Sequence, residues 1–152
     1  MMKYYWITLL FIVLLHACGS NVENHTLSSE SIYGTWELVA VTNEENGETI
    51  DTFVPGRRMI KIITPTHFSF VNHDLNKGQD SSAFFAAGAG NYSLKGNKYS
   101  EKLEFCTARG WEGHVFEFEI EIKGDTLIQQ GVEKSDALGV DRYIYETYVR
   151  VE

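Results

Sequence analysis

Two tyrosines and a glutamate share the predicted inner faces of two consecutive strands, where they could bind a ligand. In the second of these strands Leu103 and Phe105 mark the apolar face, and Tyr99 and Glu101 lie on the same face because side chains alternate along a strand. By the same test Tyr92 points inward from the preceding strand. These residue types favour an apolar or amphipathic ligand with one polar end.

Glu101 has a second interpretation, which the sequence leaves open. A carboxylate in an apolar interior is costly unless it is paired or hydrogen-bonded. Glu101 is therefore expected either to meet a cation, such as Arg58 or Arg150, or to be protonated. It belongs to a ligand pocket with Tyr92 and Tyr99, or to a structural ion pair at the closed end of a barrel.

Catalytic and metal-binding motifs are not found in the sequence. There is no Gly-x-Ser-x-Gly elbow, no phosphate-binding loop and no His-Glu-x-x-His. His67, His73 and His114 are scattered, and their spacing matches no metal-ligand pattern. We therefore expect no enzyme, no catalytic residue, no bound metal and no cofactor.

Trp111 lies on a predicted connection between strands, in the stretch Gly110-Trp111-Glu112-Gly113. An amphipathic ring at such a place serves equally well to stack on a ligand or to cover the core. Both roles stay open, and we include Trp111 among the candidate ligand-binding residues.

The elements that must position these residues are β-strands. The clearest alternation is in residues 115–122, where Phe116, Phe118, Ile120 and Ile122 face a core and three glutamates face water. Phe118 is thereby a candidate lining residue of the interior. With no convincing helical period, the count predicts an all-β, eight-stranded antiparallel up-and-down barrel with room for side chains or one small ligand. The predicted strands cover residues 34–41, 58–63, 66–71, 91–94, 98–105, 115–122, 126–130 and 142–151.

The first strand resembles the opening of lipocalins. It has Gly34 two residues before Trp36, and alternation predicts that Trp36, Leu38 and Ala40 point to one side of the strand. The resemblance implies that Trp36 closes one end of the barrel and borders the ligand space, with Arg150 of the last strand packed against it. A guanidinium over an indole is a favourable contact.

Two stretches break the strand pattern. Residues 42–57 form a long polar connection, which the lipocalin resemblance makes a lid over the open end. Residues 83–90 are rich in Ala and Gly, which predicts a bend or a place where another backbone comes close.

Further motifs resemble small lipocalin-like lipoproteins of Bacteroidetes-type bacteria. They span nearly the whole chain after the leader and lie at residues 66–68, 88–92, 99–101, 124–125 and 146–150. That family is defined by its fold and its cellular location more than by an activity, so the resemblance adds little about the ligand.

The start of the chain predicts export and a lipid anchor. Residues 1–17 hold one lysine, no acid and a short apolar run, as a secretory signal peptide does. The run ends at Leu15-His16-Ala17-Cys18, which resembles a bacterial lipobox and implies cleavage before Cys18 and acylation of that residue. The alternative is an ordinary cleavage site at which Cys18 is incidental.

The expected organisation follows from that leader: signal peptide 1–17, lipidated N-terminus and flexible tether 18–31, barrel 32–152. Several acyl chains anchor a protein stably to a membrane. Since no acidic residue follows Cys18 directly, resemblance to the sorting pattern of enteric bacteria favours the outer membrane of the cell envelope.

The formal charge of −8, without a basic stripe, argues against nucleic acid as a partner. Two functions of different classes remain. The first is a membrane-anchored binding protein for a small apolar or amphipathic molecule. The second is a non-enzymatic interaction protein, whose barrel is filled by its nine Phe and eight Tyr and whose loops dock an envelope partner.

Overall fold

Strands make up most of residues 29–151, the part of the chain that the computed structural model describes. The predicted signal peptide, Cys18 and most of the predicted tether lie outside these residues. In chain order the elements are η1 Ser29–Ile32, β1 Gly34–Glu45, β2 Glu48–Asp51, β3 Arg57–Ile63, β4 His67–Asp74, β5 Phe85–Lys95, β6 Lys98–Cys106, η2 Arg109–Trp111, β7 Val115–Lys123, β8 Thr126–Ser135, η3 Asp136–Leu138 and β9 Val140–Arg150.

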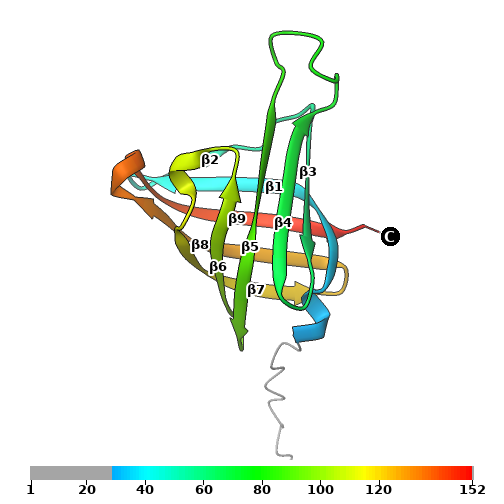
Figure 1. Ribbon diagram of the computed structural model, residues 1–152, viewed down its shortest axis with the longest axis vertical. Helices are drawn as coiled ribbons and strands as arrows, with labels where there is room; N and C mark the ends of the chain where they lie inside the picture. Colours follow the sequence, from blue (N-terminus) through cyan, green and yellow to red (C-terminus); the bar gives the residue numbers. More distant parts are fainter. Residues whose placement is uncertain (1–28, 152) are drawn as a thin grey trace, which may run out of the picture.

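The first strand closes the sheet into a barrel (Figure 1). From β3 to β9 each strand pairs antiparallel with the next one in the chain. The start of β1 pairs with β3 on one side, and most of β1 pairs with β9 on the other. The predicted eight-stranded antiparallel barrel is confirmed, and β2 is an additional strand that pairs with the far end of β1 alone.

The connection predicted over residues 42–57 is largely a β-hairpin, so its description as a patternless loop was wrong. β1 runs on to Glu45, turns at Asn46-Gly47 and returns as β2. Both turn residues have positive φ, 54° at Asn46 and 81° at Gly47, as a two-residue hairpin turn requires. Asn-Gly is a strong hairpin signal, but polar residues in both strands concealed it.

An irregularity in β1 changes which residues point inward. The pairing with β9 shifts register between Leu38 and Ala40. Ala40 is exposed, although it was predicted to lie on the same side of the strand as the buried Trp36, and Asn43 is buried further along. An extra residue in a strand reverses the alternation beyond it, which explains the error.

A second irregularity does the same near the end of β6. Leu103 pairs with Gly90, but Phe105 pairs with Ala89, so Glu104 is an extra residue. Phe105, predicted to lie inside, is 64% exposed. Cys106 takes the inward position in its place and packs against the core.

Most of the Ala- and Gly-rich stretch, residues 85–90, belongs to β5 and confirms the predicted close approach of another backbone. A Cβ atom built on Gly90 would lie 1.9 Å from the carbonyl oxygen of Lys102 on β6. No side chain fits there, and the two strands can pair only because residue 90 is glycine.

Inward-facing residues of the strands, together with η1, form one core. Phe116, Phe118 and Ile120 of β7 are buried as predicted. The other buried apolar residues are Ile32, Trp36, Ile63, Phe68, Tyr99, Leu103, Leu127, Ile144 and Tyr148.

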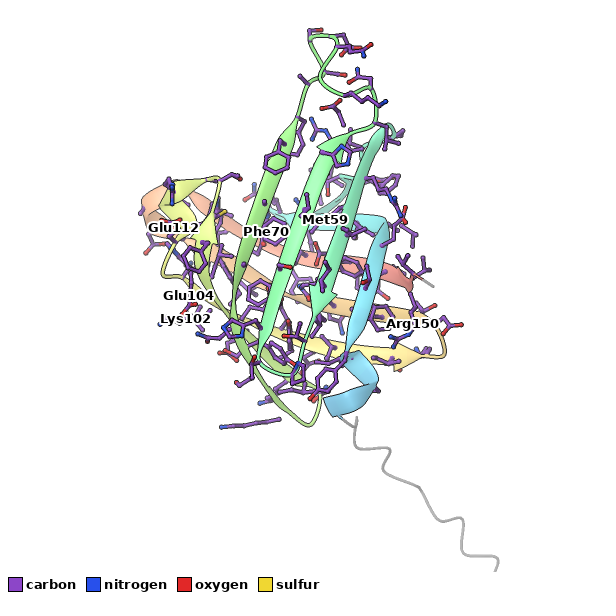
Figure 2. All side chains as sticks on the ribbon, turned by 45° about the vertical axis from the view of Figure 1, so that its right-hand side comes forward. Met59, Phe70, Lys102, Glu104, Glu112 and Arg150 are labelled. Carbon is purple, nitrogen blue, oxygen red and sulfur yellow. The ribbon has the colours of Figure 1, made fainter. Side chains whose placement is uncertain are left out.

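The two ends of the barrel differ. Tight turns and η1 lie at one end, which we call the closed end, whereas η2, η3 and the β4–β5 loop lie at the other, which we call the mouth. In Figure 1 the β4–β5 loop projects well beyond the strands. In Figure 2 Arg150 of the closed end and Glu112 of the mouth lie on opposite sides of the molecule.

Candidate functional site

The closed end is built around Trp36 and Arg150, as predicted. The guanidinium carbon of Arg150 lies 4.0 Å from the centroid of the Trp36 ring. Arg150 also donates to the carbonyl oxygens of Ser31 and Tyr33, each at 2.8 Å, and the Trp36 indole donates to the Ile32 carbonyl at 2.8 Å. These bonds fix the chain before β1 across the barrel floor.

Inside the barrel Glu101 is paired, but its partner is Lys61 of β3 rather than the predicted Arg58 or Arg150. The Lys61 ammonium lies 2.6 Å from Glu101 Oε1, and both side chains are buried. Lys61 also donates to Gln129 Oε1 at 2.6 Å. The pair and its hydrogen bond offset part of the cost of removing two charges from water.

A second carboxylate extends this network. Gln129 Nε2 donates to Glu146 Oε2 at 3.1 Å, and the Tyr148 hydroxyl donates to the same oxygen at 2.9 Å. Burial raises the pKa of Glu146 to about 7, and the opposing effects of Lys61 and of the Tyr148 hydrogen bond are smaller. Glu146 is therefore partly protonated near neutral pH.

Tyr99 and Glu101 of β6 form a buried polar cluster with Lys61. The hydroxyl of Tyr99 and Oε1 of Glu101 make no hydrogen bond of regular geometry among the residues that the structure describes, but the two side chains interact with each other, and burial, then the charge of Glu101 and its hydrogen bond, raise the pKa of Tyr99. Lys61 approaches Glu101 Oε1 closely, but without the angles of a hydrogen bond. The Glu101 carboxylate is therefore held between the Lys61 ammonium and the Tyr99 hydroxyl.

A cavity of about 390 Å³ lies at the mouth end. Its size suits a small ligand. Glu101 is its deepest residue on β6, and the Arg142–Glu133 ion pair lies at its rim. The lining residues are Phe70, Phe84, Ala86, Glu101, Leu103, Cys106, Thr107, Ala108, Trp111, Phe116, Glu133 and Arg142.

The β6–β7 connection that carries Trp111 is held in place at the mouth. Glu112 accepts a hydrogen bond from the Cys106 backbone N–H at 3.0 Å and one from Arg109 at 2.6 Å. These two contacts, the backbone bond first, lower the pKa of Glu112. The Trp111 ring packs on Phe116, with centroids 5.5 Å apart, and closes one side of the cavity.

The structure brings only part of the predicted ligand set to this cavity. Glu101 and Trp111 line it, and Tyr99 lies one inward position below Glu101 on β6. Phe118 is buried below Phe116, outside the cavity lining. Trp36 belongs to the closed end.

Tyr92 also lies toward the closed end, where its hydroxyl donates to the Thr64 carbonyl at 2.7 Å. Burial, followed by the neighbouring Tyr33, raises the pKa of Tyr92 to about 12. The Tyr92 hydroxyl is therefore already bonded within the fold.

Sequence reasoning missed Lys61, Gln129 and Arg142. Lys61 has the same parity as Ile63, which is buried, but Ile60 and Ile62 make the other face of β3 equally apolar. Parity alone could not choose between these faces. Gln129 alternates with the buried Leu127, which is the signal that could have identified it.

Within residues 29–151 no group of three or more His, Cys, Asp and Glu residues could hold a metal ion. His114 instead forms a hydrogen bond with Ser135, at the end of the neighbouring strand β8, at 3.0 Å. The helices in the same range are too short and too polar to cross a membrane.

The fold and its cavity define a closed antiparallel β-barrel with a small pocket at one end and a stacked arginine at the other. The chain belongs to the family described as domain of unknown function DUF4488, whose family model matches residues 31–152. No match is found among curated proteins.

Proposed function

We propose that this protein is a lipocalin-like, membrane-anchored envelope lipoprotein that binds a small apolar or amphipathic molecule in the mouth cavity. It acts as a binding protein and not as an enzyme. The observation that carries the proposal is the cavity itself, whose wall is mostly apolar and contains one buried carboxylate, Glu101, which is paired with Lys61. An apolar pocket with a few convergent polar groups is the usual form of a small-molecule site.

The lining supports binding of a ring-containing molecule. Four aromatic side chains, Phe70, Phe84, Trp111 and Phe116, border the cavity. Flat apolar ligands bury much surface against such rings, and each square ångström removed from water contributes about 25 cal/mol.

The membrane anchor rests on the leader sequence and on Cys18. A Cys18→Ser variant should lose its acyl chains and move from the membrane fraction to the soluble fraction. Labelling of cells with an alkyne fatty acid measures this directly. Labelled protein in the Cys18→Ser variant would contradict the anchor without affecting the cavity.

Native mass spectrometry of the chain from residue 18 onward, with Cys18→Ser, tests ligand binding. A small molecule that co-purifies and is recovered by organic extraction supports the proposal. An empty barrel that also fails to bind 1-aminoanthracene, an uncharged fluorescent probe, contradicts it.

A pair of variants assigns the probe to the cavity. Phe116→Ala removes a lining ring and should change the affinity for 1-aminoanthracene about tenfold or more. Phe105→Ala is the control, because Phe105 is equally large but points outward. Equal effects of the two substitutions would place the probe elsewhere.

A protein-docking role is the second candidate function. Phe85 and Phe105 are each 64% exposed on the outer faces of β5 and β6, which is unusual for aromatic side chains without a partner. Cross-linking in intact cells with a photoreactive residue at position 105 would identify such a partner. Loss of the cross-link in Phe85→Ser would attribute the contact to this surface.

A further inference from the structure

One edge of the sheet is left open, and it belongs to β2. This strand pairs with the far end of β1, and no other strand of residues 29–151 lies on its second side. Every other strand pairs with at least two neighbours, and all residues of β2 are exposed. An exposed strand edge is a template on which a further strand can pair.

The free backbone groups of this edge come from Thr49 and Asp51. The Thr52 N–H donates to the Val41 carbonyl on β1 at 3.1 Å. Successive residues of an antiparallel strand direct their N–H and C=O groups to opposite sides. Thr49 and Asp51 are an odd number of residues away from Thr52, so their groups point away from β1 and are open to an incoming strand.

The hairpin that carries this edge is strongly acidic. Its four carboxylates are exposed, and none of them forms an ion pair with another side chain of the described range. They belong to Glu44, Glu45, Glu48 and Asp51. Like charges directly opposite each other destabilise strand pairing, which disfavours a second copy of the same edge as the partner. Carboxylates without a cation favour a basic partner.

Ile50 gives the edge an apolar position among these acids. Its side chain is 47% exposed, and that of Val54, shortly after β2, is 44% exposed. Side chains alternate between the two faces of a strand. A strand paired with β2 would therefore place every second side chain beside Asp51 and the others beside Ile50. A segment in which basic and apolar residues alternate matches both faces.

We propose that β2 binds an extended segment of another protein, in which basic and apolar residues alternate, as an additional strand of the sheet. Hydrogen bonds to the backbone of Thr49 and Asp51 hold the segment, and its side chains provide the selectivity. The residues of β2 do not line the mouth cavity. Failure of this proposal would therefore leave the proposed function untouched.

A fluorescein-labelled hexapeptide of alternating lysine and valine is the probe. Fluorescence anisotropy measures its binding to the full chain in a non-ionic detergent at low salt. One control peptide has every backbone nitrogen methylated, which keeps the charges and removes the hydrogen-bond donors. A second control has glutamate in place of lysine. We expect the lysine–valine peptide to bind at least about tenfold more tightly than either control.

Two substitutions of Thr49 test the strand edge. Thr49→Pro removes an N–H that points away from β1, a position at which an edge strand tolerates proline. It should lower the affinity for the lysine–valine peptide about tenfold. Thr49→Ala is the matched control, because it loses the same side chain and keeps the N–H, and its affinity should be unchanged. Melting temperatures show whether both barrels are intact, and the methylated peptide decides if Thr49→Pro does not fold.

A pair of double variants tests the charges. Glu48→Gln with Asp51→Asn should lower the affinity about threefold at low salt and have little effect at high salt, because exposed charges are screened. Glu117→Gln with Glu121→Gln is the control: it changes the net charge equally, but on the outer face of β7. Its effect should be clearly smaller.

Four results would overturn the proposal. They are no binding of the lysine–valine peptide, equal binding of either control peptide, equal effects of Thr49→Pro and Thr49→Ala in folded proteins, and equal effects of the two double variants. Sedimentation velocity tests the other occupant. A dimer that Thr49→Pro abolishes and Thr49→Ala preserves would assign the edge to a second copy of the chain and would also overturn the proposal.

Discussion

Gly34 and Arg150 are in direct contact at the closed end of the barrel. A Cβ atom built on Gly34 would lie 2.6 Å from Nη1 of Arg150, and Gly34 has φ of +137°, which side chains rarely allow. The glycine therefore leaves the space in which the guanidinium reaches the carbonyls of Ser31 and Tyr33. The glycine of the Gly-x-Trp motif in β1 is therefore required by the position of Arg150 on β9.

Gly34→Ala should lower the free energy of unfolding by at least about 2 kcal/mol, because it adds backbone strain and a clash with Arg150. Gly96→Ala is the control: Gly96 also has positive φ, +64°, but nothing lies within 4 Å of its Cβ position. The Gly96→Ala variant should lose only about 1 kcal/mol of unfolding free energy. Urea denaturation followed by tryptophan fluorescence measures both. Equal losses would show that the contact with Arg150 does not matter.

Arg150→Lys should lower the free energy of unfolding by about 1 to 3 kcal/mol. Lysine keeps the charge but cannot stack flat on Trp36 and reach two carbonyls at once. Arg58→Lys is the control, since Arg58 pairs with Glu37 on the surface. Its effect should be too small to resolve in the same urea titration. If Arg150→Lys were as stable as the unmodified protein, the stacking and the two carbonyl hydrogen bonds of the guanidinium would not contribute to stability.

The barrel could be predicted because its strands alternate without interruption over most of their length. Alternation along the strand was enough to predict that Phe116, Phe118 and Ile120 are buried. The resemblance to lipocalins was enough to predict the contact between Trp36 and Arg150. Phe105 and Ala40 could not be placed by parity, because bulges at Glu104 and next to Leu38 shift the alternation. The residue types around these two positions do not indicate a β-bulge.

The site was harder to predict because its contacts join distant strands. Parity placed Tyr99 and Glu101 inside, and the structure agrees. It could not find Lys61, whose strand is apolar on both faces. Which cation meets a buried carboxylate depends on the register of β3, β6 and β8 around the barrel, and register is a property of the closed sheet.

The Lys61–Glu101 pair should show strong energetic coupling. Removal of one partner leaves a buried, unpaired charge, so Lys61→Met and Glu101→Leu should each cost about 3 to 5 kcal/mol. The double variant has no unpaired charge. Its loss of unfolding free energy should therefore be clearly smaller than the sum of the losses in the two single variants.

Urea denaturation of the four proteins at pH 7, without added ligand, completes this double-mutant cycle. The exposed pair Lys134–Asp141 provides the control, and its coupling should be undetectable. Additive losses for Lys61 and Glu101 would mean that the two charges are already hydrated inside the barrel.

Glu146 should make the barrel less stable as the pH rises toward neutrality. Burial raises its pKa from 4.5 to about 7 in the folded state. Below pH 4.5 the folded and unfolded states are both protonated, and the stabilising contribution is fully present. Between pH 4.5 and 7 the unfolded state loses the proton first, so this contribution, about 3 kcal/mol, is lost as the pH rises through the folded pKa.

Glu146→Gln isolates this effect, because glutamine resembles the protonated acid and can still accept from Tyr148. The difference in unfolding free energy between Glu146→Gln and the unmodified protein should grow from pH 4.5 to pH 7 and then level off. Asp74, whose pKa is lowered by the backbone N–H groups of Phe84 and Gly78, gives the opposite trend at acid pH. Both proteins share that trend, and it cancels in the difference. Parallel stability curves over this range would show that the Glu146 carboxylate reaches water within the folded barrel.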